Sequence, residues 1–226
     1  MPIEITPIAH IRSPFTGKFA IPRQSNIADS IRSVVVFEPD FRNPDALRGI
    51  EEFEYIWLIW FFSENTAQSW SPTVRPPRLG GNKRKGVFAT RSPFRPNSLA
   101  LSSVRLLSVE LHSSDGPLLH ISGADILDGT PIFDIKPYLP YTDSHPEARS
   151  GFAPQADSKP LTVVFPEDIS SKLPVDMRQA ITEILIHDPR PQYQHDPDRI
   201  YTFSFSDLEI SFSVSNDDIL TIVKIK

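Results

Sequence analysis

Residues 54–62 read EYIWLIWFF and are apolar almost throughout. A β-strand that is buried on both faces has this composition, as in a closed barrel or beneath a partner subunit. Trp57 and Trp60 are therefore expected to be core residues rather than a platform for a ligand. The run is far too short to cross a membrane. This stretch predicts a β-rich interior.

Further strand-like segments lie on both sides of this run, at residues 3–11, 33–38, 85–91, 99–111 and 118–121, with a hairpin loop at 113–116. A short helix is expected from Asn43 to Gly49, because asparagine can cap a helix and Pro44 suits its first turn. The 23 prolines against 9 glycines disfavour long helices. Without any βαβ alternation, residues 1–142 are predicted to form an all-β barrel or sandwich.

A second unit follows this β-rich part. Residues 143–159 are polar and rich in proline and serine, which is typical of a linker. Residues 160–226 contain a strand, a helix with apolar residues on one face between Leu173 and Leu185, and three more strands. We expect a small α+β domain that would be marginally stable alone.

The charge of the chain is unevenly distributed. The formal net charge is −5, yet residues 65–109 hold 8 of the 23 Lys and Arg and none of the 28 Asp and Glu. A basic block of this kind indicates an anionic partner, with phosphate as the leading candidate.

Several classes of site are excluded or unsupported. The chain has no cysteine, which excludes disulfides, thiolate metal sites and cysteine nucleophiles. Its six histidines lack ligand spacing, so no metal is expected. There is neither a phosphate-binding loop, nor a Rossmann fingerprint, nor a G-x-S-x-G elbow. Nothing at the N-terminus resembles a signal peptide, so we expect a cytoplasmic protein without a membrane association.

Four loops remain as candidates for chemistry, each with a purely structural alternative. The glycines of residues 79–82 (LGGN) either let the backbone approach a ligand or simply turn the chain. Residues 22–24 (PRQ) form either a surface turn or a loop that presents a guanidinium to a ligand. Asp125 and Asp128 either accept hydrogen bonds from an amine and ribose hydroxyls or cap their own backbone in Asx turns. Residues 187–193 (HDPRPQY) either stack on a base and clamp a phosphate or simply end a helix.

Six motifs taken together carry a resemblance to a known family: PRQ at 22–24, LRGIE at 47–51, SPTVRPPRLGGN at 71–82, GVFATRSPFRPN at 86–97, DGTPIFDIKPYLPY at 128–141 and DPRPQY at 188–193. They resemble the bacterial tRNA methyltransferase O family. The similarity covers nearly the whole chain, including the C-terminal unit, and the central motifs are long and unusual.

This resemblance implies a single-sheet β-barrel that works as a homodimer, with the cofactor close to the subunit interface. It implies S-adenosylmethionine as the cofactor, and methylation of N6 of threonylcarbamoyladenosine at position 37 of threonine tRNA. The residues expected at the cofactor are Pro22, Arg23, Gln24, Ser63, Glu64, Arg91, Leu101, Asp125, Ile126, Leu127 and Asp128. Those expected at the tRNA are Lys83, Arg84 and Lys85 of the basic block and Asp188, Pro189, Arg190, Pro191 and Tyr193 of the C-terminal unit.

The chain departs from the family pattern in three places. Ser63 and Glu64 follow Phe62 where family members often read FHQ, although glutamate can still accept from ribose hydroxyls or the adenine amine. Residues 95–102 read RPNSLALS where RPNPIGLS is common, and PRQ is followed by Ser25 rather than proline. Within the basic block, we expect residues 83–85 to be the most exposed and Arg91 to be among the least exposed.

The acceptor nitrogen bears a carbamoyl group and is a poor nucleophile, so loss of its proton would help the transfer. Asp125, Asp128 and Tyr193 are candidate bases by residue type, and the threonyl carboxylate of the substrate is another. Two other functions fit the same residues: a non-catalytic RNA-binding module, and an S-adenosylmethionine-dependent enzyme that acts on another, small anionic substrate.

Overall fold

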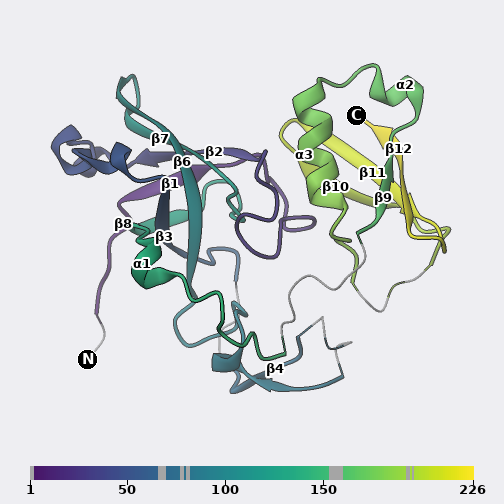
Figure 1. Ribbon diagram of the computed structural model, residues 1–226, viewed down its shortest axis with the longest axis horizontal. Helices are drawn as coiled ribbons and strands as arrows, with labels where there is room; N and C mark the ends of the chain where they lie inside the picture. The colour runs from purple at the N-terminus through teal and green to yellow at the C-terminus, as the bar shows by residue number, and fades with distance from the viewer. Residues whose placement is uncertain are drawn as a thin grey trace.

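The computed structural model describes residues 3–65, 70–76, 79, 82–152, 160–191, 194 and 196–226. Within them, six antiparallel strands close a barrel in the order β1-β2-β7-β6-β3-β8, and β8 pairs with β1 (Figure 1). These strands are β1 (Ala9–Arg12), β2 (Arg32–Phe37), β3 (Tyr55–Phe61), β6 (Leu99–Ser113), β7 (Gly116–Ser122) and β8 (Pro131–Pro137). The barrel confirms the predicted single-sheet fold.

The apolar run at residues 54–62 contains β3, whose residues alternate between buried and partly buried. Ile56, Leu58 and Trp60 are buried in the barrel core, whereas the intervening residues are partly buried. The expectation of full burial on both faces was therefore wrong. The outer face of β3 is covered only in part, for example by the Tyr138 ring, whose centroid lies 5.5 Å from that of Trp57. Trp60 is buried in the core as predicted, but Trp57 is only partly buried, and both residues also line a cavity.

Short elements surround the barrel: the 3₁₀ helices η1 (Pro39–Phe41), η2 (Pro44–Leu47), η3 (Ile50–Glu52) and η5 (Val87–Ala89), the strand pair β4 (Thr73–Val74) and β5 (Lys85–Gly86), and α1 (Pro140–Asp143). The expected cap is present, since the Asn43 side chain accepts from the backbone N–H of Asp45 at 3.0 Å. The predicted strand over residues 85–91 was wrong beyond Gly86, where the chain turns into η5. The first strand begins at Ala9 rather than Ile3, which is exposed.

The C-terminal unit packs α3 (Val175–Leu185) on a sheet of order β10-β11-β12-β9, described over residues 160–226 except for the three masked positions. Its elements are β9 (Thr162–Val164), α2 (Glu167–Ser170), β10 (Tyr201–Phe205), β11 (Leu208–Val214) and β12 (Ile219–Ile225). Helix α3 buries Ala180, Ile181, Ile184 and Leu185, which confirms the predicted apolar face. Across the described residues, no helix has the length and apolar character needed to span a bilayer.

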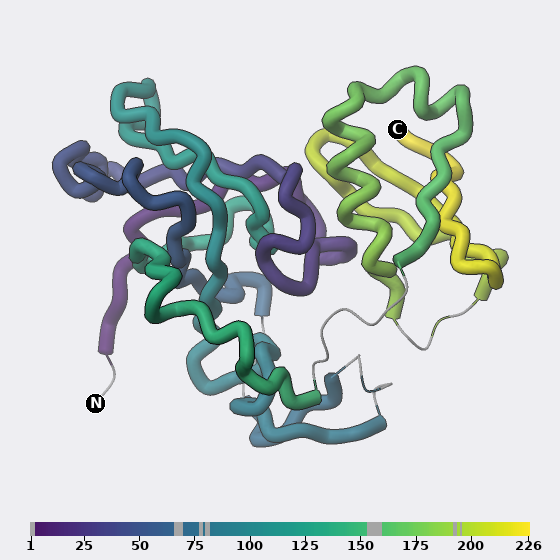
Figure 2. Tube along the Cα trace, in the orientation of Figure 1, coloured from purple at the N-terminus to yellow at the C-terminus, as the bar shows by residue number. Residues whose placement is uncertain are grey.

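The loop between β1 and β2, residues 13–31, belongs to the core of the C-terminal unit (Figure 2). The Phe15 ring lies 5.7 Å from that of Phe205, and the backbone N–H of Ser206 donates to the Pro14 carbonyl at 2.6 Å. Ser30 donates through its N–H and its hydroxyl to the carboxylate of Glu183, at 2.8 and 2.7 Å. The pKa of Glu183 is lowered overall. Burial alone would raise it, but the hydrogen bonds from Ser30 and Gln179 and the charge of Arg32 together outweigh burial. The loop therefore joins the barrel to the C-terminal unit by packing into the core of that unit.

Candidate functional site

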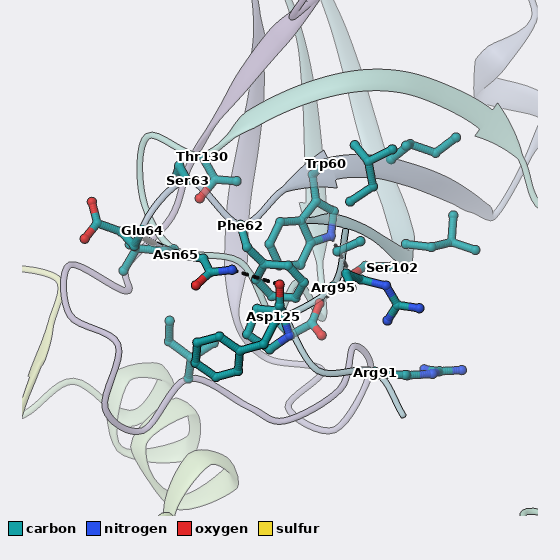
Figure 3. Close-up of a pocket in the computed structure, with 18 of the residues that line it drawn as sticks. Trp60, Phe62, Ser63, Glu64, Asn65, Arg91, Arg95, Ser102, Asp125 and Thr130 are labelled. Carbon is teal, nitrogen blue, oxygen red and sulfur yellow. Dashed lines mark hydrogen bonds between the residues drawn. The ribbon is translucent and has the colours of Figure 1, made fainter. Parts of the chain in front are cut away.

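A cavity of about 1000 Å³ opens where loop 13–31 meets the ends of β3 and β6. Figure 3 shows Trp60, Phe62 and Asp125 grouped at its centre, with Glu64 and Arg91 on opposite sides of the group. Its wall also includes the turn after β3 and residues 88–97 of the basic block. The cavity thus brings together segments that lie far apart in the sequence.

The floor of the cavity carries a chain of hydrogen bonds. The indole N–H of Trp60 donates to the Ser102 hydroxyl at 3.0 Å, and that hydroxyl donates to the carboxylate of Asp125 at 2.6 Å. The pairing of β3 with β6 sets this geometry, because it places Leu58 opposite Ser102 and Trp60 opposite Ala100. The result is a carboxylate with a fixed orientation inside a cavity.

Burial raises the pKa of Asp125, and the hydrogen bond from Ser102 and the positive charge of Arg91 offset this only in part. A carboxyl group with a raised pKa is a stronger base than an ordinary aspartate. Nothing in the sequence singled out Ser102, since only the strand register brings it to Asp125.

The PRQ loop forms one wall. Pro22, Arg23 and Gln24 line the cavity, and the Gln24 side-chain oxygen accepts from a guanidinium N–H of Arg91. Arg91 is exposed, so the expectation that it would be among the least exposed basic residues was wrong. It lies at the rim, where its guanidinium reaches across to the loop. Leu101 of β6 lines the same wall.

The opposite wall is the turn that follows β3. Ser63 and Glu64 line the cavity there, and Lys18 donates to the Glu64 carbonyl at 2.8 Å while its amine lies 3.6 Å from the Glu64 carboxylate. The Phe62 ring packs edge-on against Trp60, with centroids 4.5 Å apart. This turn is thereby tied to loop 13–31.

Residues 125–128 divide between the cavity and other roles. Asp125 and Leu127 line the cavity. Ile126 is fully buried in the barrel core, and the carboxylate of Asp128 accepts from the backbone N–H of Ser13 at 2.8 Å. Neither Ile126 nor Asp128 lines the cavity, and Asp128 has the backbone-capping role that its sequence also allowed.

The basic block is less uniform than its composition indicates. Lys83 and Arg84 are exposed, as predicted, and Arg84 donates to the Thr73 hydroxyl at 2.9 Å. Lys85 is half-buried because its amine lies 5.5 Å from the ring centroid of Phe152, so the exposure predicted for it was wrong. The predicted turn at 79–82 falls partly outside the described residues, since positions 80 and 81 are not among them.

In the C-terminal unit, the Arg190 side chain is only 6% exposed. It donates from Nε and Nη2 to the two carboxylate oxygens of Asp188, at 2.8 and 2.9 Å. These hydrogen bonds raise the pKa of Arg190. The Arg190 carbonyl accepts from Nη2 of Arg23 at 3.2 Å. The sequence led us to expect that the Arg190 guanidinium faces RNA, whereas in the structure it is buried against Asp188. Tyr193 lies outside the described residues.

A family model for the tRNA-methyltransferase O N-terminal domain matches residues 10–144, and one for the TrmO C-terminal domain matches residues 158–226. The chain belongs to the tRNA-methyltransferase O family. The described residues contain no group of three or more His, Asp or Glu side chains arranged to hold a metal ion.

Relatives within this family span almost the whole chain. The tRNA (adenine(37)-N6)-methyltransferase of Escherichia coli K12 is 38% identical over 217 residues, with 92% of each chain covered. A putative S-adenosylmethionine-dependent methyltransferase of Pseudomonas aeruginosa is 38% identical, with 98% of this chain and 96% of the relative covered. The crystal structure of TrmO from Pseudomonas aeruginosa superposes with a TM-score of 0.79 at 33% identity, over the full length of both chains.

Proposed function

We propose that this protein transfers a methyl group from S-adenosylmethionine to N6 of adenosine 37 in tRNA, and that its substrate is threonylcarbamoyladenosine in threonine tRNA. The observation that carries the proposal is the oriented, partly buried carboxylate of Asp125 in a cavity whose wall includes Arg91 and Arg95 of the acid-free basic block. Membership of the tRNA-methyltransferase O family supports the same reaction.

The cavity suits the cofactor in size and chemistry. Its volume of about 1000 Å³ is at the upper end for small-molecule sites. The Glu64 carboxylate offers acceptors for hydroxyl or amine groups, and the Trp60 and Phe62 rings favour a cationic sulfonium. The remaining residues proposed to hold the cofactor are Pro22, Arg23, Gln24, Ser63, Arg91, Leu101 and Leu127. When bound, the cofactor supplies an electrophilic methyl group on sulfur.

We assign to Asp125 the removal of the N6 proton. Of the carboxylates considered as bases, Asp128 is engaged with the backbone at Ser13, outside the cavity, whereas Asp125 lines it. The Ser102 hydroxyl donates to one carboxylate oxygen of Asp125, and the backbone at Asp125 and Ser25 also hydrogen-bonds this carboxylate. Two carboxylate oxygens provide about four acceptor positions, so the group keeps capacity to take a proton. The Asp125 carboxylate would take the proton that leaves N6 as the N–C bond forms, and the bound cofactor would supply the methyl group and retain the electron pair of the broken S–C bond.

The basic block would hold the anticodon arm through its phosphates. Lys83 and Arg84 are exposed in the basic block, and Arg91 is exposed at the rim of the cavity. Contacts of this kind supply affinity, while the target base is selected by stacking and by its edges.

We further propose that the enzyme is a homodimer in the cytoplasm, where its tRNA substrate is modified. Exposed leucines at 99, 101, 107 and 111 form an apolar stripe along β6, in which Leu107 lies at a bulge between Leu106 and Ser108. Such a stripe is a favourable surface for a second copy of the chain. Leu99 and Leu101 also line the cavity, so a partner seated on this stripe would border the cofactor site.

The proposal is tested by analysing nucleosides from the tRNA of a strain that lacks the gene. Mass spectrometry is expected to show threonylcarbamoyladenosine without its N6-methyl group, and the methylated nucleoside is expected to return on complementation. Unchanged methylated nucleoside in the deletion strain would refute the proposed substrate.

A further inference from the structure

Beside the cavity, three large aromatic side chains face solvent. Among the described residues of the basic block, Trp70, Phe88 and Phe94 are 49%, 73% and 49% exposed. The Trp70 and Phe88 rings stack, with centroids 6.2 Å apart and an interplanar angle of 27°. We call these three residues the aromatic platform. Exposed aromatic rings gathered in this way are unfavourable in water unless a partner covers them.

The platform separates the cavity from a neighbouring hollow. Phe88 and Phe94 line the cavity, whereas Trp70 and Phe94 line a hollow of about 570 Å³. Arg95 lies in both walls. A planar group on the platform would therefore lie next to whatever occupies the cavity.

The segment that carries Phe94 is held in place by side-chain hydrogen bonds. Asn65 donates to the Pro93 carbonyl at 2.8 Å, and Ser98 donates to the same carbonyl at 3.1 Å. A guanidinium N–H of Arg95 donates to the carbonyls of Thr90 and Ser92, at 3.2 and 3.4 Å. The rings are thus presented on a braced backbone, which lowers the entropy cost of binding to them.

The charge around the platform decides between an RNA and a protein partner. No Asp or Glu occurs between residues 65 and 109, and Arg75, Arg84 and Arg91 are exposed in this window. Exposed rings interleaved with arginines are the arrangement that binds unpaired nucleotides, in which bases stack on rings and guanidinium groups hold phosphates.

We propose that the aromatic platform stacks the unpaired bases that flank the target adenosine, with one of them seated in the hollow beside the cavity. This inference rests on the proposed function, because it takes the RNA to be the anticodon loop. It adds residues that hold the RNA independently of charge: the rings select an unpaired, unstacked loop, whereas Lys83 and Arg84 bind any phosphate chain.

The test compares Phe88→Ala and Trp70→Ala with Phe41→Ala, which removes an exposed ring of η1 outside both pocket walls. Affinity for an anticodon stem-loop is expected to fall about 5- to 150-fold in the platform variants, the loss expected for one base–aromatic stack. Phe41→Ala is expected to bind as the wild type does. Phe88→Leu, which keeps an apolar side chain but no ring, should lose most of the same affinity.

Two further readouts distinguish stacking from charge. The slope of log K against log salt is expected to stay unchanged in Phe88→Ala and to become shallower in a Lys83→Glu, Arg84→Glu variant. Stem-loop binding should quench tryptophan fluorescence, and Trp70→Phe should remove the share of that quenching that comes from the platform, because Trp70 is 49% exposed; any quenching that remains comes from Trp57 and Trp60, which line the cavity.

Wild-type affinity in both platform variants, with methyl transfer by the wild-type enzyme intact, would overturn the platform and leave the proposed function standing. A change from dimer to monomer in these variants, seen by light scattering, would also overturn it, because the rings would then belong to a subunit interface. Failure of the wild-type enzyme to methylate any tRNA would instead refute the proposed function.

Discussion

Replacing Asp188 by Asn should destabilise the protein and weaken cofactor binding, although Asp188 does not line the cavity. Asp188 has a backbone φ of +47°, a conformation that asparagine tolerates almost as well as aspartate. The substitution therefore removes the charge from the pair with Arg190 without adding backbone strain. Its effect then reports on the buried ion pair itself.

The magnitude follows from the burial of the pair. Arg190 is 6% exposed, and loss of one partner of a buried ion pair costs about 3–5 kcal/mol. The Asp188 side chain is 35% exposed, and asparagine keeps one acceptor oxygen, so we expect a loss of about 2 kcal/mol. For a chain of this size that lowers Tm by about 4–8 °C. Because Arg23 donates to the Arg190 carbonyl, cofactor affinity should fall about 3- to 10-fold.

The assays are thermal unfolding and calorimetric titration with S-adenosylmethionine. Asp45→Asn is the matched control, because the Asp45–Arg48 pair is more than 70% exposed at both side chains and should change stability by less than about 0.5 kcal/mol. If Asp188→Asn kept the Tm and cofactor affinity of this control and lost only tRNA affinity, the inward-facing role of Arg190 would be refuted.

Four further predictions follow from the site and the fold. Arg91→Ala should lower cofactor affinity in calorimetry, because it releases Gln24; wild-type binding would remove Arg91 from the site. Charge reversal at residues 83–85 together should weaken tRNA binding while cofactor binding persists, and unchanged tRNA affinity at moderate salt would contradict the phosphate contacts. Asp125→Asn should lower turnover about 10²- to 10⁴-fold, as a base does. Burial raises the pKa of Asp125 above its ordinary value of 3.8, so the ionised carboxylate destabilises the folded protein at higher pH. Asp125→Asn should therefore be more stable than the wild type at neutral pH and lose this advantage as the pH falls toward 3.8. Urea denaturation at several pH values can check this. Gly123→Ala should cost about 1–3 kcal/mol in the same assay, since φ is +76° and a Cβ would lie 3.2 Å from the Asn26 Cα; equal stability would show that the backbone there can move.

The barrel was predictable because its signals are local. The spacing of apolar residues predicts strand β3 and the one-sided helix α3. The turn residues at 113–116 predict the hairpin between β6 and β7. The strand predicted over residues 85–91 failed because its valine and phenylalanine do not pair in a sheet; Val87 is buried in a 3₁₀ turn, and Phe88 is exposed.

Most of the residues expected at the cofactor line one cavity, the PRQ loop and Asp125 among them, whereas Ile126 and Asp128 do not. Their contacts with a cofactor stay predictions. Sequence alone gave no sign that Ser102 orients Asp125, or that Arg190 is turned inward to Asp188. The Ser102–Asp125 contact depends on strand register, which joins residues 23 apart in the sequence. Asp188 and Arg190 are only two residues apart, but the burial of the Arg190 side chain depends on the surrounding fold.

The most direct test of the proposed reaction uses purified protein, S-adenosylmethionine with a deuterated methyl group, and threonine tRNA with or without threonylcarbamoyladenosine. Nucleoside mass spectrometry is expected to find the deuterated methyl group on N6 of threonylcarbamoyladenosine, with far less transfer in Asp125→Asn. No label on the modified tRNA, or equal label on tRNA without the threonylcarbamoyl group, would contradict the proposed function.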